Sequence, residues 1–182
     1  KSDIERLRKK TTMYISNKGT KGALHLCKEA INNAIDECMS EKSPANKIDI
    51  TLDSNTNQLM VIDNGRGIPF TQVETICTFL HSGSNIDKET EKEDAAEFAG
   101  ENGVGTTAIN ALSKKLYFTI RRDGKIGTFT FVDGKMQEPV YTKGKANDHG
   151  TAIVFIPDEK YLGKCTISPK ELESWINNIS YT

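Results

Sequence analysis

The sequence lacks the features that mark a membrane protein, a disulfide-stabilised protein or a self-sufficient DNA-binding module. It has no run of about 18 apolar residues, so we expect no transmembrane helix and no membrane association. Its 4 cysteines include no CxxC pair, which disfavours a zinc site and is typical of a reduced, cytoplasmic protein. The formal net charge is −1, whereas a module that grips DNA alone is usually basic. We therefore expect any DNA contact to lie in other parts of the protein.

The 182 residues suffice for one domain with a hydrophobic core, and they contain no internal repeat and no proline-rich linker. Apolar periodicity predicts helices over 21–39, 73–80 and 106–113, strands over 47–52, 59–62 and 151–156, a hairpin of 115–121 and 126–132, and a last helix capped by Ser168. This order predicts an α/β fold of the α+β type, a two-layer sandwich with helices on one face of a mixed, mostly antiparallel sheet. Residues 83–103 combine glycines with a charged run, so we expect a long mobile loop there.

The first long helix carries a polar face of unusual composition. Glu29, Asn33, Asp36 and Glu37 are spaced so that they share one side of the helix, opposite its apolar stripe. Most such faces are simply solvated. Solvated faces usually include Lys or Arg, however, and no basic residue lies between Glu29 and Glu41. Carboxylates and carboxamides together suit a hard cation such as Mg²⁺, or the activation of water.

The segment 63–69, DNGRGIP, follows directly on a predicted strand. Two glycines within three residues allow a backbone or a ligand to approach closely, and Asp63 at the strand end can accept a hydrogen bond from an exocyclic amine. An Asn-Gly pair alone would indicate an ordinary turn. The complete DNGRGIP string after an apolar strand is far more specific.

The segment 100–105, GENGVG, leads into the helix predicted from 106. Backbone N–H groups at a glycine-rich helix start can hold phosphate, although glycines also make plain flexible loops. No GxxxxGK[ST] motif occurs and no strand precedes these glycines, which excludes a P-loop and a dinucleotide fingerprint. A later Gly150-Thr151 pair would by itself indicate only the start of a strand.

Taken in order, these four segments resemble the sequence boxes of the GHKL (Bergerat) ATP-binding fold. Further strings resemble the GHKL domain of type IIA DNA topoisomerase B subunits, the family of gyrase and topoisomerase IV. These strings are MYI (13–15), EAINNAIDE (29–37), DNGRGIP (63–69), GVGTTAINALS (103–113) and RRDGK (121–125). The resemblance covers most of the chain, from about residue 7 to residue 157, and implies a single GHKL domain over 1–182 with an ATP lid at about 83–103.

The resemblance implies a role for individual positions. Glu29 would be the general base that activates water, and Asn33 would ligate Mg²⁺. Asp63 would accept a hydrogen bond from the adenine amino group, with support from Thr151. The remaining cofactor-binding positions implied by the family are Asp36, Arg66, Gly67, Ile68, Pro69, Gly100, Asn102, Gly103, Val104 and Gly105.

The implied activity is ATP binding and hydrolysis that drive closure of a dimer clamp for DNA strand passage. The implied cofactors are ATP and Mg²⁺, and the implied partners are a second copy of this domain, a topoisomerase A subunit and DNA. We expect the transducer and DNA-cleavage domains of the family to lie outside these 182 residues, so that the isolated domain has little or no turnover. The alternatives are another GHKL ATPase, of the chaperone or mismatch-repair type, and a nucleotide-binding module without catalysis.

Overall fold

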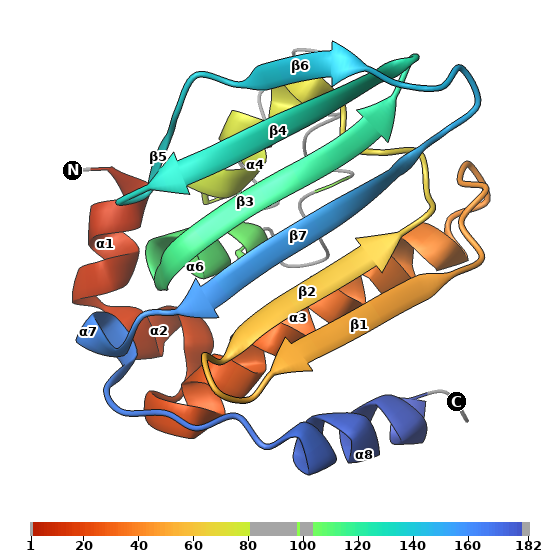
Figure 1. The fold of residues 1–182 in the computed structure, drawn as a ribbon. Coiled ribbons are helices and arrows are strands. Elements are labelled where there is room, and N and C mark those ends of the chain that lie inside the picture. Colours follow the sequence, from red (N-terminus) through yellow and green to blue (C-terminus); the bar gives the residue numbers. More distant parts are fainter. Residues whose placement is uncertain (1, 81–97, 99–103, 180–182) are drawn as a thin grey trace.

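The computed structural model describes residues 2–80, 98 and 104–179, and these residues form two layers (Figure 1). One layer is a sheet with the strand order β1-β2-β7-β3-β4-β5, and β6 also pairs with β4. Every strand pairing in it is antiparallel. The strands are β1 (Ile48–Asp53), β2 (Gln58–Asp63), β3 (Ser113–Arg122), β4 (Lys125–Val132), β5 (Lys135–Met136), β6 (Val140–Lys143) and β7 (Gly150–Pro157).

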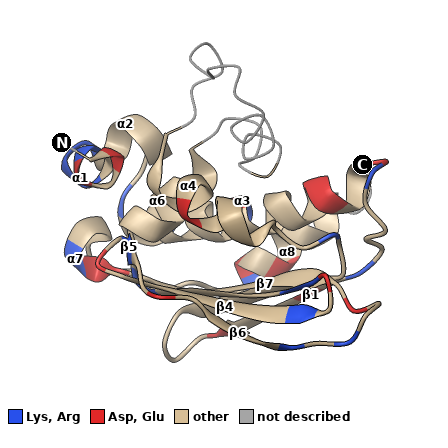
Figure 2. Cartoon of the chain, turned by 90° about the horizontal axis from the view of Figure 1, so that it is seen from above, with Lys and Arg blue, Asp and Glu red and all other residues tan. Residues whose placement is uncertain are grey.

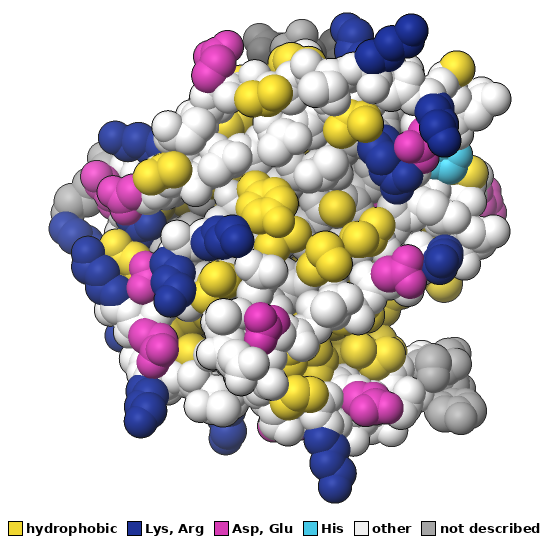
Figure 3. Space-filling model, in the orientation of Figure 1, with side chains coloured by type: hydrophobic (Ala, Val, Ile, Leu, Met, Phe, Trp, Pro, Cys, Tyr) yellow, Lys and Arg dark blue, Asp and Glu magenta, His cyan; other side chains and the backbone are white. Residues whose placement is uncertain are grey.

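The helices form the second layer on one face of the sheet, as the view along the sheet shows (Figure 2). They are α1 (Asp3–Lys9), α2 (Thr11–Ile15), α3 (Gly19–Met39), α4 (Val73–Thr78), α6 (Gly105–Ala111), α7 (Glu159–Leu162) and α8 (Pro169–Ile179), with a 3₁₀ turn, η1 (Phe70–Gln72). The opposite face of the sheet carries small apolar areas separated by charged side chains (Figure 3). The predicted two-layer architecture is confirmed. None of the helices in the described part of the chain has the length and apolarity needed to cross a bilayer.

Helix α3 supplies the main contact between the two layers. Its apolar stripe includes Cys27, Ile31 and Ala34, which are buried against the sheet. From the sheet, alternate residues of β2 and β7 point into the same core, among them Leu59 and Phe155, which are fully buried. This packing fixes the position of the polar face of α3 relative to the ends of β2 and β7.

The β3–β4 hairpin is tighter than the sequence pattern predicts. The strands pair out to Arg122 and Lys125, which leaves a two-residue turn of Asp123 and Gly124. Both turn residues have positive φ, 53° and 71°, as a type I′ turn requires. The short helices α1, α2 and α7 and the short strands β5 and β6 were not predicted. All four residues of β6 are exposed, so this strand has no alternating pattern to detect.

Helix α6 is fixed by buried polar side chains rather than by apolar contacts alone. The Thr107 hydroxyl donates toward the carbonyl oxygens of Ile76 (3.0 Å) and Phe79 (2.7 Å) at the end of α4. The Asn110 amide donates to the carbonyl oxygens of Cys77 (2.9 Å) and Gly134 (3.0 Å). These bonds join α6 to α4 and to the β4–β5 turn, and so hold the first turn of α6 in place. Of the predicted lid over 83–103, only Phe98 is among the described residues.

We expect Asn110→Ala to destabilise the domain by on the order of 3 kcal/mol, because it leaves two buried carbonyl oxygens without their donor. Urea unfolding of both proteins measures the change. Asn147→Ala is the matched control, since Asn147 is exposed and its replacement should change the free energy of unfolding by less than about 0.5 kcal/mol. Equal effects of the two substitutions would contradict the anchoring role of Asn110.

Candidate functional site

A cavity of about 120 Å³ lies between α3, the ends of β2 and β7, and the loop that follows β2. A single water needs roughly 10–15 Å³, so the cavity is sized for an organic ligand rather than for one water or ion. It is lined by seven of the residues predicted for the site, namely Asn33, Asp36, Asp63, Arg66, Gly67, Ile68 and Thr151. The structure thus brings together three segments that are far apart in the sequence.

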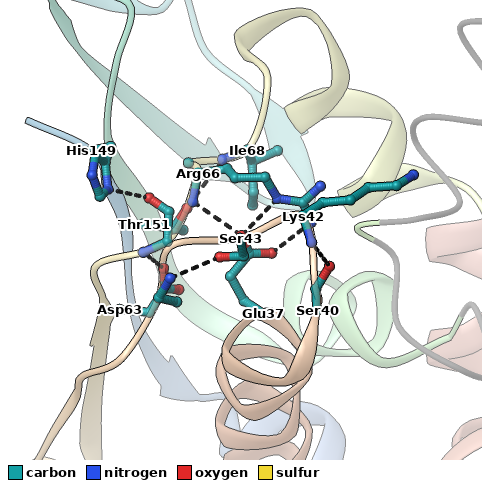
Figure 4. Close-up of polar contacts among 12 residues, drawn as sticks. Glu37, Ser40, Lys42, Ser43, Asp63, Arg66, Ile68, His149 and Thr151 are labelled. Carbon is teal, nitrogen blue, oxygen red and sulfur yellow. Dashed lines mark hydrogen bonds and ion pairs between the residues drawn. The ribbon is translucent and has the colours of Figure 1, made fainter. Parts of the chain in front are cut away.

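Glu37 and Arg66 join the helix layer to the loop after β2. The guanidinium Nε and Nη2 donate to the two carboxylate oxygens of Glu37, each at 2.9 Å, and the Arg66 backbone N–H donates to Oε1 at 3.0 Å (Figure 4). Burial alone would raise the pKa of Glu37, but hydrogen bonds from Arg66 and Ser43 outweigh it and lower this pKa to about 2. A Cβ at Gly65 would collide with Glu37, so only glycine fits beneath this ion pair.

Asp63 is the buried carboxylate of the cavity, with 8% of its surface exposed. Its Oδ1 accepts a hydrogen bond from the Gly65 backbone N–H at 2.8 Å. Burial raises the pKa of Asp63 to about 6, against the lowering effect of the Gly65 and Thr151 backbone hydrogen bonds. The neighbouring Glu37 carboxylate raises this pKa further. Asp63 is therefore a proton-sensitive acceptor that points into a largely apolar space.

The glycine loop continues along the wall of the cavity. Gly67 has φ of 77°, a value that non-glycine residues rarely adopt, and its carbonyl oxygen accepts a hydrogen bond from Arg122 at 2.8 Å. The Ile68 backbone N–H donates to the Thr151 hydroxyl at 3.2 Å. Pro69 follows as the residue before η1, outside the lining of the cavity.

Glu29 lies two turns before Glu37 on α3, beside the first turn of α6. A Cβ at Gly105 would collide with the Glu29 carboxylate, so these two residues are in direct contact. His25, one turn earlier, places Nε2 3.5 Å from Glu29 Oε1. Burial raises the pKa of Glu29, while His25 lowers it and Asp36 raises it. His25 was not predicted, although its i, i+4 spacing from Glu29 is the signal that could have identified it.

Asn33 is the predicted metal ligand, and its amide nitrogen donates to the Thr106 hydroxyl at 3.1 Å. Its carbonyl oxygen is the atom that can face a cation. Among the described residues there is no group of three or more His, Cys, Asp or Glu that could hold a metal. The carbonyl oxygen of Asn33 is a hard donor of the kind that Mg²⁺ accepts, and a bound phosphate chain and water would supply further oxygen ligands.

The predicted phosphate segment is described only in part. Val104 precedes α6, and Gly105 is its first residue, in contact with Glu29. Gly100, Asn102 and Gly103 lie outside the described residues.

His149 and Asn64 belong to the surroundings of the site but were not predicted. The Asn64 side chain accepts hydrogen bonds from the backbone N–H groups of Asn46 (2.9 Å) and Lys47 (3.0 Å), which fixes the loop on its β1 side. His149 Nδ1 lies 2.9 Å and 2.7 Å from the carbonyl oxygens of Asn64 and Gly65. These contacts span 17 to 85 residues, and no local pattern indicates them.

Comparison with known proteins gives consistent matches. The family profile described as histidine kinase-, DNA gyrase B-, and HSP90-like ATPase matches residues 19–160. The B subunit of DNA gyrase from Spiroplasma citri is 36% identical over 90% of this chain and 26% of its own length. The B subunit of DNA topoisomerase 4 from Mycoplasma pneumoniae is 31% identical over 98% of this chain and 29% of its own length. The chain thus spans about a quarter of the length of these curated relatives.

Two solved structures are similar over almost the whole chain. The 43K ATPase domain of Thermus thermophilus gyrase B, solved in complex with an aminocoumarin, has a TM-score of 0.79 at 29% identity and covers 98% of this chain and 45% of its own. The topoisomerase IV ATP-binding domain of Francisella tularensis, solved with a small-molecule inhibitor, has a TM-score of 0.76 at 30% identity and covers 95% of this chain and 81% of its own.

The raised pKa of Asp63 predicts a pH-dependent effect of Asp63→Asn on stability. A folded-state pKa of about 6, against an ordinary value of 3.8, favours the folded state fully below pH 3.8, and this contribution is lost as pH rises through 6. Asparagine has no ionisable carboxyl group, so the variant loses no such contribution as the pH rises. Between about pH 4 and pH 8, the free energy of unfolding of the variant should therefore rise relative to the natural chain by up to about 3 kcal/mol. Urea titrations of both proteins across this range test the prediction, and a pH-independent difference would contradict it.

Proposed function

Because the chain belongs to the histidine kinase-, DNA gyrase B- and HSP90-like ATPase family, we propose that it is the ATP-binding and ATP-hydrolysing domain of a type IIA DNA topoisomerase B subunit. The relatives named above are gyrase and topoisomerase IV subunits rather than chaperones or mismatch-repair ATPases. The observation that carries the proposal is the cavity lined by Asp63 and Asn33, with Glu29 one turn before Asn33 on α3. Glu29 and Glu37 are eight residues apart on α3, which is about 12 Å along the helix axis.

This length suits an extended nucleotide. With adenine against Asp63, the amino group donates to the carboxylate, and Thr151 and the Gly67–Ile68 backbone face the ring. The ribose then lies near the Arg66–Glu37 pair, and the phosphates extend along α3 toward Asn33 and Glu29. Guanine carries an oxygen where adenine carries the amino group, so the Asp63 carboxylate would repel it. The site is thereby selective for ATP.

Hydrolysis in this proposal depends on Glu29 as general base. Its raised pKa strengthens it as a proton acceptor, and the ring of His25 at 3.5 Å orients it and stabilises its charge. Asn33 would hold Mg²⁺ through its carbonyl oxygen, and this cation would neutralise charge on the phosphates. The absence of a side chain at Gly105 leaves room for the Glu29 carboxylate beside the first turn of α6.

In the whole enzyme, ATP would favour dimerisation of two such domains, closing a clamp around a DNA segment, and hydrolysis would reopen it. This cytoplasmic enzyme would have three kinds of partner, namely a second copy of the same polypeptide, a topoisomerase A subunit, and DNA held by other domains. The net charge of −1 supports the assignment of DNA contacts to those other domains. The isolated chain should bind ATP and turn it over slowly or not at all.

Calorimetric titration of the chain with a non-hydrolysable ATP analogue tests the assignment of adenine to Asp63. We expect Mg²⁺-dependent binding of the ATP analogue and at least about tenfold weaker binding of the GTP analogue. Asp63→Asn should weaken binding of the ATP analogue by at least about tenfold, because the asparagine carbonyl keeps the Gly65 hydrogen bond and turns its N–H toward the adenine amino group. Asp53→Asn, on the exposed end of β1, is the control and should leave the affinity unchanged. If Asp63→Asn leaves the affinity for the ATP analogue unchanged, adenine does not bind at Asp63.

Steady-state ATPase measurements on the full-length protein test Glu29. Glu29→Gln should lower kcat by about 100-fold or more and change the affinity for the ATP analogue by less than about twofold, since a general base acts on the chemical step rather than on binding. Glu41→Gln, in the exposed segment after α3, should leave both quantities unchanged. Normal turnover by the Glu29 variant would refute its role as the base.

A further inference from the structure

His149 connects the start of β7 to the loop that follows β2. Its Nδ1 lies 2.9 Å from the carbonyl oxygen of Asn64 and 2.7 Å from that of Gly65. Both oxygens are acceptors only, so Nδ1 must carry the hydrogen and donate to them. His149 lies beside the cavity but does not line it, and the proposed function gives it no role.

The two carbonyl groups belong to the residues immediately after Asp63. The β2–β7 ladder ends at the pair Asp63 and Thr151, so beyond this point the His149 side chain replaces backbone pairing between the two segments. Gly65 is held on both sides, because its N–H donates to Asp63 Oδ1 while its carbonyl oxygen accepts from His149. Gly65 therefore links His149 to one of the two backbone hydrogen bonds of the Asp63 carboxylate, the other being with Thr151.

His149 is itself anchored to the centre of the sheet. The preceding residue, Asp148, forms an ion pair with Arg121 Nη1 at 2.6 Å, and Arg121 pairs with Gly150 in the β3–β7 register. A Cβ at Gly150 would collide with the Asp63 carbonyl oxygen, which shows how closely β7 approaches the end of β2. Figure 4 shows His149, Thr151 and Asp63 on the same side of the site.

We propose that His149 is a positioning residue that sets the orientation of the Asp63 carboxylate and thereby the selectivity for a 6-amino purine. The proposal rests on the proposed function, in which adenine binds at Asp63. His149 acts through the Asn64–Gly65 backbone and makes no contact with the nucleotide. Its contribution should consequently be confined to ligands that donate a hydrogen bond to Asp63.

Two variants, His149→Asn and His149→Asp, have side chains of nearly the same size and shape but differ in whether they can donate a hydrogen bond. His149→Asn places an amide nitrogen at the same bond position as Nδ1, so it can still donate to the two carbonyl oxygens. His149→Asp has nearly the same shape but presents only a negatively charged acceptor, which the carbonyl oxygens repel. His149→Ala removes the donor without adding charge and serves as the second disruptive variant.

The experiment compares the affinities of the natural chain and each variant for two ligands by calorimetry. One ligand is the non-hydrolysable ATP analogue, and the other is the corresponding purine riboside triphosphate analogue, which lacks the 6-amino group. We expect His149→Asp and His149→Ala to weaken ATP-analogue binding by about tenfold, the equivalent of roughly one hydrogen bond, while binding of the purine analogue changes less than about twofold. His149→Asn should keep both affinities within about twofold of the natural chain.

Three outcomes would overturn the proposal. Equal weakening of both ligands would show that His149 only supports the fold, and unchanged affinities would show that it contributes nothing. Failure of His149→Asn to retain the affinity for the ATP analogue would show that the donor is not what matters. Thermal unfolding of each variant establishes that it is folded at the titration temperature. If the natural chain does not bind the ATP analogue, the proposed function fails first, and that result is distinct from loss of binding in the variants alone.

Discussion

The ion pair between Glu37 and Arg66 joins the two layers of the domain where the cavity opens. Both side chains are mostly buried, with 11% and 22% of their surfaces exposed, and two parallel hydrogen bonds fix their relative orientation. Removing either partner would leave a buried charge without its counter-ion, which in proteins costs several times more than a surface pair contributes. The absence of a side chain at Gly65 is a condition of this contact. The loop that carries Arg66, Gly67 and Ile68 is thus attached to α3 before any ligand arrives.

The same ion pair explains why two neighbouring carboxylates have opposite properties. Glu37 is held ionised by Arg66 and has a pKa of about 2, whereas Asp63 is buried beside this negative charge and has a pKa of about 6. One carboxylate is held in an ion pair, and the other is buried in the wall of the cavity. Separation of pKa values within one site is a common sign of divided roles. Here it follows from the burial of Asp63, which outweighs the lowering effect of Arg121, and from the hydrogen bonds that Arg66 and Ser43 make to Glu37.

Most of the fold follows from local sequence patterns, and the exceptions have a common cause. The helix α3, the strands β2 and β7 and the β3–β4 hairpin were predicted because each is long enough to show its period. The helices α1 and α2 are short, and β6 has no buried side, so neither kind of element has a detectable pattern. In the site, DNGRGIP and the polar face of α3 are visible as strings. The role of His149 is not, because it depends on a contact between residues 84 apart.

Glu29 and Glu37 are carried by one uninterrupted helix, and this has a consequence for how the sequence can change. The eight-residue interval from Glu29 to Glu37 sets their separation and also keeps both side chains on the same side of α3. One inserted or deleted residue between them would rotate one end by about 100° relative to the other and move it by about 1.5 Å. Substitutions within the interval can be accommodated by repacking, whereas a change in its length cannot. Length variation among relatives should therefore be found in the connections of the sheet and never in this interval.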